Sequence, residues 1–277
     1  MKAFLMYKDQ DFDINQALPV NEQDLIQDLE LTTLFNAMAQ GDQFLFDVAK
    51  KVVLCGVSDL NIILYRQNIL KDCIKNSPIV RDIYDIAVEA IESEKKHYYG
   101  LLKRYPEAIL RRSIEVMQMF VVMLKKLKSI SYEYDDKFES EGFTVFFSML
   151  KKELGDDYIG SIENHLRDLK LRDGLVISAT LGKGNKGTDY SLLKKPDKKQ
   201  SWIQRIFAHK TPAYAYYISD RDESGFRALA ELKNQGINLV ANAFAQSNDH
   251  ILCFFKMLRM ELAFYVGCLN LHRILNQ

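Results

Sequence analysis

A glycine- and lysine-rich stretch, TLGKGNKGTDYSL, runs from Thr180 to Leu192 and contains the pattern G-x-G-x-x-G at residues 182–187. In a dinucleotide-binding protein this pattern follows a strand and opens a helix, because the helix N-terminus holds the pyrophosphate. Here the residues before the pattern (175–181) and after it (188–193) both have the composition of strands. The sequence therefore favours a β-hairpin turn over a nucleotide-binding loop.

Two other phosphate-binding loops fit no better. A Walker A loop ends in Gly-Lys followed by Ser or Thr, whereas this one ends in Gly187-Thr188-Asp189. A protein-kinase glycine loop is followed by a Val-Ala-Ile-Lys strand and a His-Arg-Asp loop, and the sequence contains neither. A cryptic nucleotide site is left as a hypothesis, which the absence of an ATP-dependent shift in melting temperature would exclude.

Positive charge gathers in and after this stretch. Residues 183–199 carry six lysines and two aspartates, a local net charge of +4, although the whole chain has 37 basic and 37 acidic side chains. Lysines on a glycine-containing hairpin suit contact with nucleic-acid phosphates, without reading of the base sequence. The alternative is a solvated loop that its lysines keep soluble. The candidates for contact with the DNA backbone are Lys183, Lys186, Lys194, Lys195, Lys198 and Lys199.

Other side chains that could do chemistry form weaker patterns. Cys268 and His272 lie one helical turn apart, and His250 and Cys253 are similarly close, but neither has the second pair that a zinc site requires. The patterns G-x-S-x-G and H-E-x-x-H are both missing from the sequence. We therefore predict no catalytic, cofactor-binding or metal-binding residues, and a chain that is not an enzyme as it stands.

The elements that must position the hairpin are mostly helices. Apolar residues recur with helical spacing along most of the chain, and glycine and proline are scarce, at 13 and 5 of 277 residues. The third helix is expected to be capped by Ser58. Strands are expected at 175–181, 188–193 and 213–218. Helices are expected over 22–40, 43–54, 59–75, 77–102, 107–132, 142–154, 156–171 and 226–275. The last range holds either one unbroken helix or two helices that meet near Gly236 or at 247–249.

This pattern predicts a mostly α fold, an elongated bundle of long helices with a small antiparallel β insert. We divide the chain into an N-terminal helical region (1–173), the β insert (174–219) and the return helices (220–277). The four cysteines are scattered and form no C-x-x-C, which is typical of reduced thiols in a cytoplasmic protein. No apolar run approaches the roughly 20 residues of a membrane span.

Three stretches resemble the core, or lever, domain of MutS mismatch-repair proteins. Residues 28–73 are similar to its start: a leucine-rich helix and a second helix are followed by Asp59, Ile62 and the pair Arg66-Gln67. The stretch AYAYYISDRDESGFRALAELKN is similar to the family's return from its β clamp. The stretch FFKMLRMELAFYVGCLNLHRIL is similar to the last lever helix, which leads to the ATPase.

The resemblance implies an N-terminal fragment of a MutS-like ATPase that carries motion between DNA and the ATPase. ATP and Mg are then expected only in a C-terminal domain beyond Gln277. The expected partners are double-stranded DNA, the chain's own ATPase domain and, in the full-length protein, a second copy. A helix over 226–275 would span roughly 75 Å. Arg66 is expected to be structural and to bridge helices. The rival hypothesis is a helical protein–protein scaffold with no nucleic-acid role.

Overall fold

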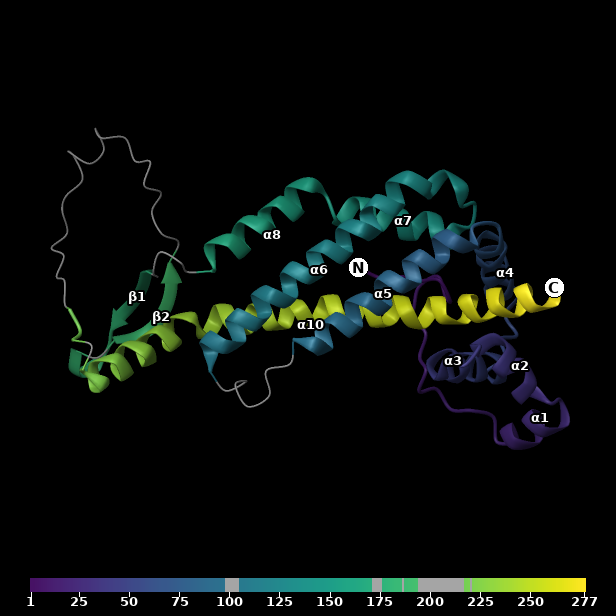
Figure 1. Cartoon of the computed structure of the whole chain (residues 1–277), viewed down its shortest axis with the longest axis horizontal. Coiled ribbons are helices and arrows are strands. Elements are labelled where there is room, and N and C mark those ends of the chain that lie inside the picture. Colours follow the sequence, from purple (N-terminus) through teal and green to yellow (C-terminus); the bar gives the residue numbers. More distant parts are fainter. Residues whose placement is uncertain (98–104, 171–175, 186, 194–216, 220) are drawn as a thin grey trace. The chain divides into compact units, whose positions relative to one another are not determined.

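A computed structural model describes residues 1–97, 105–170, 176–185, 187–193, 217–219 and 221–277. Within these residues the chain forms nine α-helices and one two-stranded antiparallel sheet (Figure 1). This confirms the predicted mostly α class with a small antiparallel β element. The chain divides into two compact units, the first made of Met1–Tyr98, Val116–His165 and Asn248–Gln277, and the second of Tyr99–Glu115 and Leu166–Ser247. The three-part division of the sequence stays a prediction.

The first unit is helical. It contains α1 (Glu22–Asp28), α2 (Leu31–Ala39), α3 (Gln43–Leu54), α4 (Leu60–Lys75), α5 (Ser77–Lys96), most of α6 (Pro106–Tyr134), α7 (Glu141–Glu153), most of α8 (Asp156–Asp168) and the second half of α10 (Glu223–Leu275).

Short acidic side chains start two of these helices. The Asp42 carboxylate accepts the first free N–H groups of α3. At α4, Asp59 Oδ1 accepts the N–H of Asn61 at 2.8 Å. The prediction that Ser58 caps this helix was therefore wrong by one residue. Asp59 is the last residue in an extended conformation, so its side chain can reach the free N–H groups.

The first predicted helix is two helices, which corrects the single helix over 22–40. The chain turns at Glu30, which has a φ of +48° and separates α1 from α2. Among the residues of α1 none is fully buried, whereas α2 buries Phe35 and Met38. Packing of α2 therefore sets its direction independently of α1, although the apolar spacing continues across the break.

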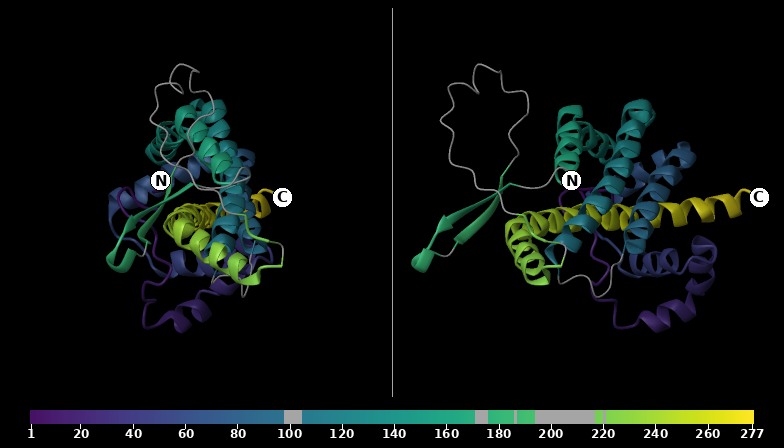
Figure 2. Two further views of the ribbon diagram at one scale, coloured as in Figure 1. Left: turned by 90° about the vertical axis from the view of Figure 1, so that its left-hand side faces the viewer. Right: turned by 60° about the vertical axis from the view of Figure 1, so that its left-hand side comes forward.

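The second half of α10 packs against α2 and α3 (Figure 1 and Figure 2). Phe35 and Met38 are buried in this cluster, with Phe264 and Leu271 of α10 partly buried against them. A hydrogen bond accompanies this apolar contact: Asn270 Nδ2 of α10 donates to the Met38 carbonyl at 2.8 Å. The C-terminal end of α10 is thus held by both kinds of contact.

Helices α4 and α7 approach each other closely at Gly142. A Cβ atom added there would lie 2.5 Å from Cδ1 of Ile69 and 3.1 Å from the hydroxyl of Tyr65. Ile69 is fully buried, so other parts of the protein surround its side chain. A helical glycine is used here because no side chain fits between the two helices.

We expect Gly142→Ala to lower the free energy of unfolding by about 1–3 kcal/mol, because overpacking outweighs the better helix propensity of alanine. Urea denaturation measures the change. Gly160 of α8 is the matched control, since a Cβ atom added there meets nothing within 4 Å. Gly160→Ala should leave stability unchanged or raise it by up to about 1 kcal/mol. Equal effects at the two glycines would contradict the close approach.

The second unit contains the β-hairpin, formed by β1 (Val176–Leu181) and β2 (Gly187–Leu193), and the first half of α10. A Cβ atom at Gly236 would lie 2.6 Å from Cδ1 of Ile177, so β1 packs directly on α10 at this glycine. Of the one or two helices predicted over 226–275 the structure has one, since α10 is continuous over 53 residues. Gly236 permits the close contact and does not end the helix.

The third predicted strand, at 213–218, receives no support. Its first four residues lie outside the described part of the chain. Tyr217 and Ile218 are described and belong to no strand.

Candidate nucleic-acid interface

The G-x-G-x-x-G pattern connects two antiparallel strands. Thr180 in β1 pairs with Thr188 in β2, and Leu181 pairs with Gly187. Between the strands lies a single 3₁₀ turn, η3 (Lys183–Asn185), in which Gly184 has a φ of +71°. No helix follows the pattern, and so no helix N-terminus is available for a pyrophosphate. The predicted hairpin turn is confirmed.

Only one of the six candidate lysines lies in the described part of the chain. Lys183 is exposed in the turn between the strands. The acidic residue nearest in sequence, Asp189, accepts a hydrogen bond from the Thr180 hydroxyl at 2.8 Å. The side chain of Asp189 is thus engaged by the opposite strand. Lys186, Lys194, Lys195, Lys198 and Lys199 lie outside the described residues, so their role stays a prediction.

The hairpin presents most of its surface to solvent. Every residue of β1 except Ile177 is exposed, and Leu181 at its end is 74% exposed. Ile177 is the residue that packs on Gly236 of α10. The hairpin is therefore attached along one side and open on the other, as a surface arm for an extended partner would be.

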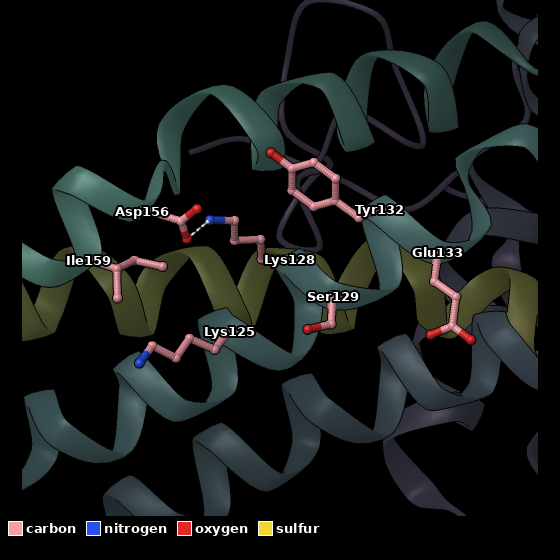
Figure 3. A pocket seen from close by; sticks show the side chains of 7 residues that line it. All are labelled: Lys125, Lys128, Ser129, Tyr132, Glu133, Asp156 and Ile159. Atoms are coloured by element: carbon pink, nitrogen blue, oxygen red, sulfur yellow. Dashed lines mark hydrogen bonds and ion pairs between the residues drawn. The ribbon is translucent and has the colours of Figure 1, made fainter.

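A hollow in the first unit offers a different candidate (Figure 3). It has a volume of about 500 Å³ and lies between α6 and α8. Its two lysines are both paired: Lys128 Nζ lies 2.6 Å from Asp156 Oδ1, and Lys125 Nζ lies 2.6 Å from Glu163 Oε1. Hydrogen bonding to Lys128 lowers the pKa of Asp156, so the pair stays ionised near neutral pH. An anionic ligand would have to displace these carboxylates, and the hollow is therefore a weaker site than the hairpin.

The cysteine–histidine pairs do not form a metal site. Burial raises the pKa of the Cys268 thiol to about 12, which keeps it protonated and unsuited to a metal. His272 Nε2 lies 3.0 Å from Asn276 Nδ2. Cys253 is exposed. Among the residues that the structure describes, no cluster of three or more His, Cys, Asp or Glu side chains is arranged to hold a metal ion.

No α-helix within the described ranges has the length and apolar character that crossing a membrane requires.

The sequence predicted that Arg66 bridges helices, and this prediction was wrong. Its Nε donates to the Met6 carbonyl at 2.9 Å, and its guanidinium lies 4.5 Å from the centre of the Tyr7 ring. The residue is structural, as predicted, but it holds the N-terminal segment. Sequence reasoning also missed Glu261, a fully buried carboxylate. One signal marked it in advance: it is the only acidic residue in the apolar run from Met260 to Cys268.

Comparison with known families decides where this fold belongs. The family model of the MutS2 N-terminal domain matches residues 58–277, well over half of the chain. The chain belongs to the MutS2 N-terminal domain family. The predicted relationship to MutS proteins is thereby confirmed. The residues that match the MutS2 N-terminal domain include α4, the hairpin and α10, whereas α1, α2 and α3 precede them. No curated protein and no solved structure matches the chain significantly.

Proposed function

We propose that this chain is the non-catalytic lever region of a MutS-like DNA-repair ATPase, and that its basic hairpin contacts the DNA backbone. The observation that carries the proposal is the continuity of α10. This one helix supplies residues to the unit with the hairpin and to the unit with the buried core. A stiff helix shared by two units is a physical means of coupling sites that lie far apart.

Each half of α10 is anchored within its own unit. In the second unit Ile177 of the hairpin packs on Gly236, and Lys233 Nζ lies 2.5 Å from Glu107 Oε1 of α6. In the first unit Arg81 of α5 donates to Asn270 Oδ1 at 2.8 Å. A force on the hairpin would therefore act on one end of a helix whose other end is held by several partners.

The resemblance to MutS proteins also gives the partners in this proposal. ATP and Mg would bind in a C-terminal ATPase domain of the full-length protein, which would act as a homodimer in the cytoplasm on double-stranded DNA. A role in mismatch repair follows from the same resemblance. In this chain the proposed contribution is mechanical and electrostatic, with no chemical step.

We expect the chain to bind a DNA duplex with an affinity that falls steeply with salt, because lysine–phosphate contacts release counterions. Changing four of the candidate lysines to glutamine should weaken binding and reduce the slope of log K against log salt by up to about 3–4. Fluorescence anisotropy between about 50 and 200 mM salt measures both quantities. The four residues are Lys183, Lys186, Lys194 and Lys195.

The control removes the same number of positive charges from exposed positions on helices of the first unit. The control variant should retain the DNA affinity and the salt slope of the unchanged chain. The proposal attributes the loss of affinity to where the four candidate lysines lie, and not to the change in net charge. Equal losses in both variants, or no binding at low salt, would contradict the DNA-contact proposal. The control residues, all changed to glutamine, are Lys71, Lys95, Lys126 and Lys152.

One observation favours the rival function, a protein–protein scaffold. Large apolar side chains of α10 are exposed in the second unit, among them Leu229, Leu232 and Leu239. Exposed apolar residues on one helix are typical of surfaces that bind other proteins. A chain that binds no DNA at low salt but self-associates, and that stops associating when Leu232 and Leu239 become serine, would favour this function.

A further inference from the structure

The first residues of the chain are the feature that the lever function does not explain. Residues 3–12, which we name the N-terminal strap, form no helix or strand. They nevertheless include some of the most buried side chains of the molecule: Leu5 and Met6 are fully buried, and Phe12 is 2% exposed. The strap lies outside residues 58–277, the part that matches the MutS2 family, yet it packs on residues inside that part.

A buried carboxylate of α10 holds the strap by its backbone. Glu261 Oε2 accepts the N–H of Leu5 at 2.6 Å, and Glu261 Oε1 accepts the N–H of Phe12 at 3.2 Å. One side chain therefore binds the backbone at Leu5 and at Phe12, the two buried ends of a segment whose middle residues, 8–10, are exposed. A carboxylate accepts backbone N–H groups strongly, and such bonds do not depend on the side chains of the bound segment.

Three further side chains bind strap carbonyls. Two come from α4: the Tyr65 hydroxyl donates to the Phe4 carbonyl at 2.6 Å, and Arg66 Nε donates to the Met6 carbonyl at 2.9 Å. The third comes from α10, where the buried Tyr265 hydroxyl donates to the Leu5 carbonyl at 2.6 Å. Burial raises the pKa of Tyr65 to about 12, which keeps its hydroxyl protonated as a donor.

Glu261, Tyr65, Arg66 and Tyr265 are named the receptor residues. All of the hydrogen bonds described above reach main-chain atoms of the strap, and Arg66 and Tyr65 also lie against the side chains of Tyr7 and Lys8. Recognition of the main chain with apolar side chains buried alongside is how proteins bind extended peptides. We propose that the receptor residues form a peptide-binding site between α4 and α10, and that the N-terminal strap is its exchangeable internal ligand, able to leave and return while the helices stay folded.

The geometry around the strap is compatible with exchange. Beyond the receptor contacts the strap makes an ion pair between Lys8 and Glu141 of α7, whose side chains are both about half exposed. Such exposed pairs contribute little. After Phe12 the chain continues through a turn in which Asp13 and Asn15 are exposed. This turn can act as the hinge on which the strap swings out.

The protonation state of Glu261 makes binding of the strap depend on pH. Burial raises the pKa of Glu261 to about 7, partly opposed by the N–H groups that it accepts. The titratable groups that interact with Glu261 are Asp11 on the strap, Tyr65 on α4 and Tyr265 on α10, and Tyr265 in turn interacts with Arg66 of α4. The Glu261 carboxyl group binds a proton more tightly when the strap covers it than when the strap has left and water surrounds it. Protonation of Glu261 therefore stabilises the bound strap below the ordinary pKa of a glutamate. This stabilisation is lost as pH rises through about 7.

We therefore expect strap release to be faster at about pH 8 than at about pH 6, by several-fold. The comparison is made with Glu261→Gln, which cannot titrate and should show a smaller ratio between the two pH values. The amino group of Met1, which lies 3.1 Å from Glu153 Oε2, is present in both proteins and cancels. A ratio unchanged by Glu261→Gln would contradict the assignment of the pH dependence to Glu261.

The exchange itself is tested by cutting the hinge of the folded full chain. A recognition site for a specific protease is inserted between Asn15 and Gln16, in the exposed turn. After cleavage the N-terminal piece should stay bound through gel filtration. A labelled synthetic peptide with the sequence of residues 1–13 should then replace it, with no change in helical circular dichroism.

Two changes test which contacts hold the strap. In the cleaved chain Glu261→Ala should release the piece at least about tenfold faster, because two buried N–H groups lose their acceptor. Glu141→Gln, which removes only the exposed ion pair with Lys8, should change the rate by less than about twofold. A peptide with N-methyl groups at Leu5 and Phe12 should fail to exchange. Equal binding of that peptide, or release only together with loss of helix, would overturn the proposal.

Hydrogen exchange on the uncut chain gives an independent test should the insertion prevent folding. The N–H groups of Leu5 and Phe12 should exchange through an opening of lower free energy than the N–H groups of Leu262 and Val266 in α10. If all four require the same opening, the strap is an integral part of the core and the proposal is wrong.

Discussion

Replacing Phe255 by alanine is expected to lower the free energy of unfolding of the first unit by about 3–5 kcal/mol. Phe255 is fully buried in α10, and its ring stacks on that of Phe120 in α6, with 5.7 Å between the ring centres and 28° between the planes. Alanine removes the ring from the contact between two long helices and leaves a cavity that the neighbouring backbone cannot close. Urea denaturation followed by circular dichroism measures the loss.

The same helix supplies a matched control. Phe226 also lies in α10 but is 46% exposed. Phe226→Ala makes the same chemical change without creating a buried cavity, and should cost less than about 1 kcal/mol. Similar losses at the two positions would show that helix propensity, not packing on Phe120, determines the effect at Phe255.

The second large effect is expected at Asp72, a buried carboxylate of α4. Its oxygens accept the N–H of Glu139 at 3.0 and 3.2 Å and the N–H of Ser140 at 2.7 Å. These bonds fix the turn that leads into α7. Asp72→Ala leaves two N–H groups without this acceptor and should lower the free energy of unfolding by about 2–4 kcal/mol.

Two comparisons separate the hydrogen bonds from other consequences of the change. Asp72→Asn keeps one acceptor oxygen and is expected to lose less stability than Asp72→Ala. Asp82→Ala removes an exposed carboxylate from α5 and should change stability by no more than about 0.5 kcal/mol. If Asp72→Ala behaved like Asp82→Ala, the turn before α7 would not depend on its buried acceptor.

Local sequence rules predicted most of the helices of this protein. The range 43–54 predicted for the second helix coincides with α3, and α7 and the start of α8 lie within one residue of their predicted positions. These helices combine an amphipathic period with a capping side chain or a glycine at the boundary. Both signals act over a few residues, and so they are readable without the fold.

The sequence was least informative where contacts between residues distant in the chain determine the conformation. Glu30 takes a left-handed conformation that only glycine or asparagine would have signalled, because α2 follows its own packing surface. One alternative for the last helix placed a break near Gly236, whereas this glycine accommodates Ile177 from a hairpin more than fifty residues earlier in the chain. Neither contact can be derived from the residues on either side of it.

The candidate interface was partly visible in the sequence. The lysine cluster is a property of composition, and strand residues on both sides of the glycines required a hairpin turn, which the structure has. The receptor residues for the strap were not visible, because Leu5 and Glu261 are 256 residues apart in the sequence. No periodicity marks residues 3–12, since their order comes from side chains that donate to and accept from their backbone.

The sequence by itself determined the helical class, most helix boundaries, the hairpin turn and the relationship to MutS proteins, because these depend on local spacing and residue type. Only the tertiary structure decided where Arg66 donates, why Gly142 and Gly236 must be glycine, and what buries Glu261. Those outcomes depend on which surfaces meet after folding, and a buried polar group is stable only once its distant partners are in place.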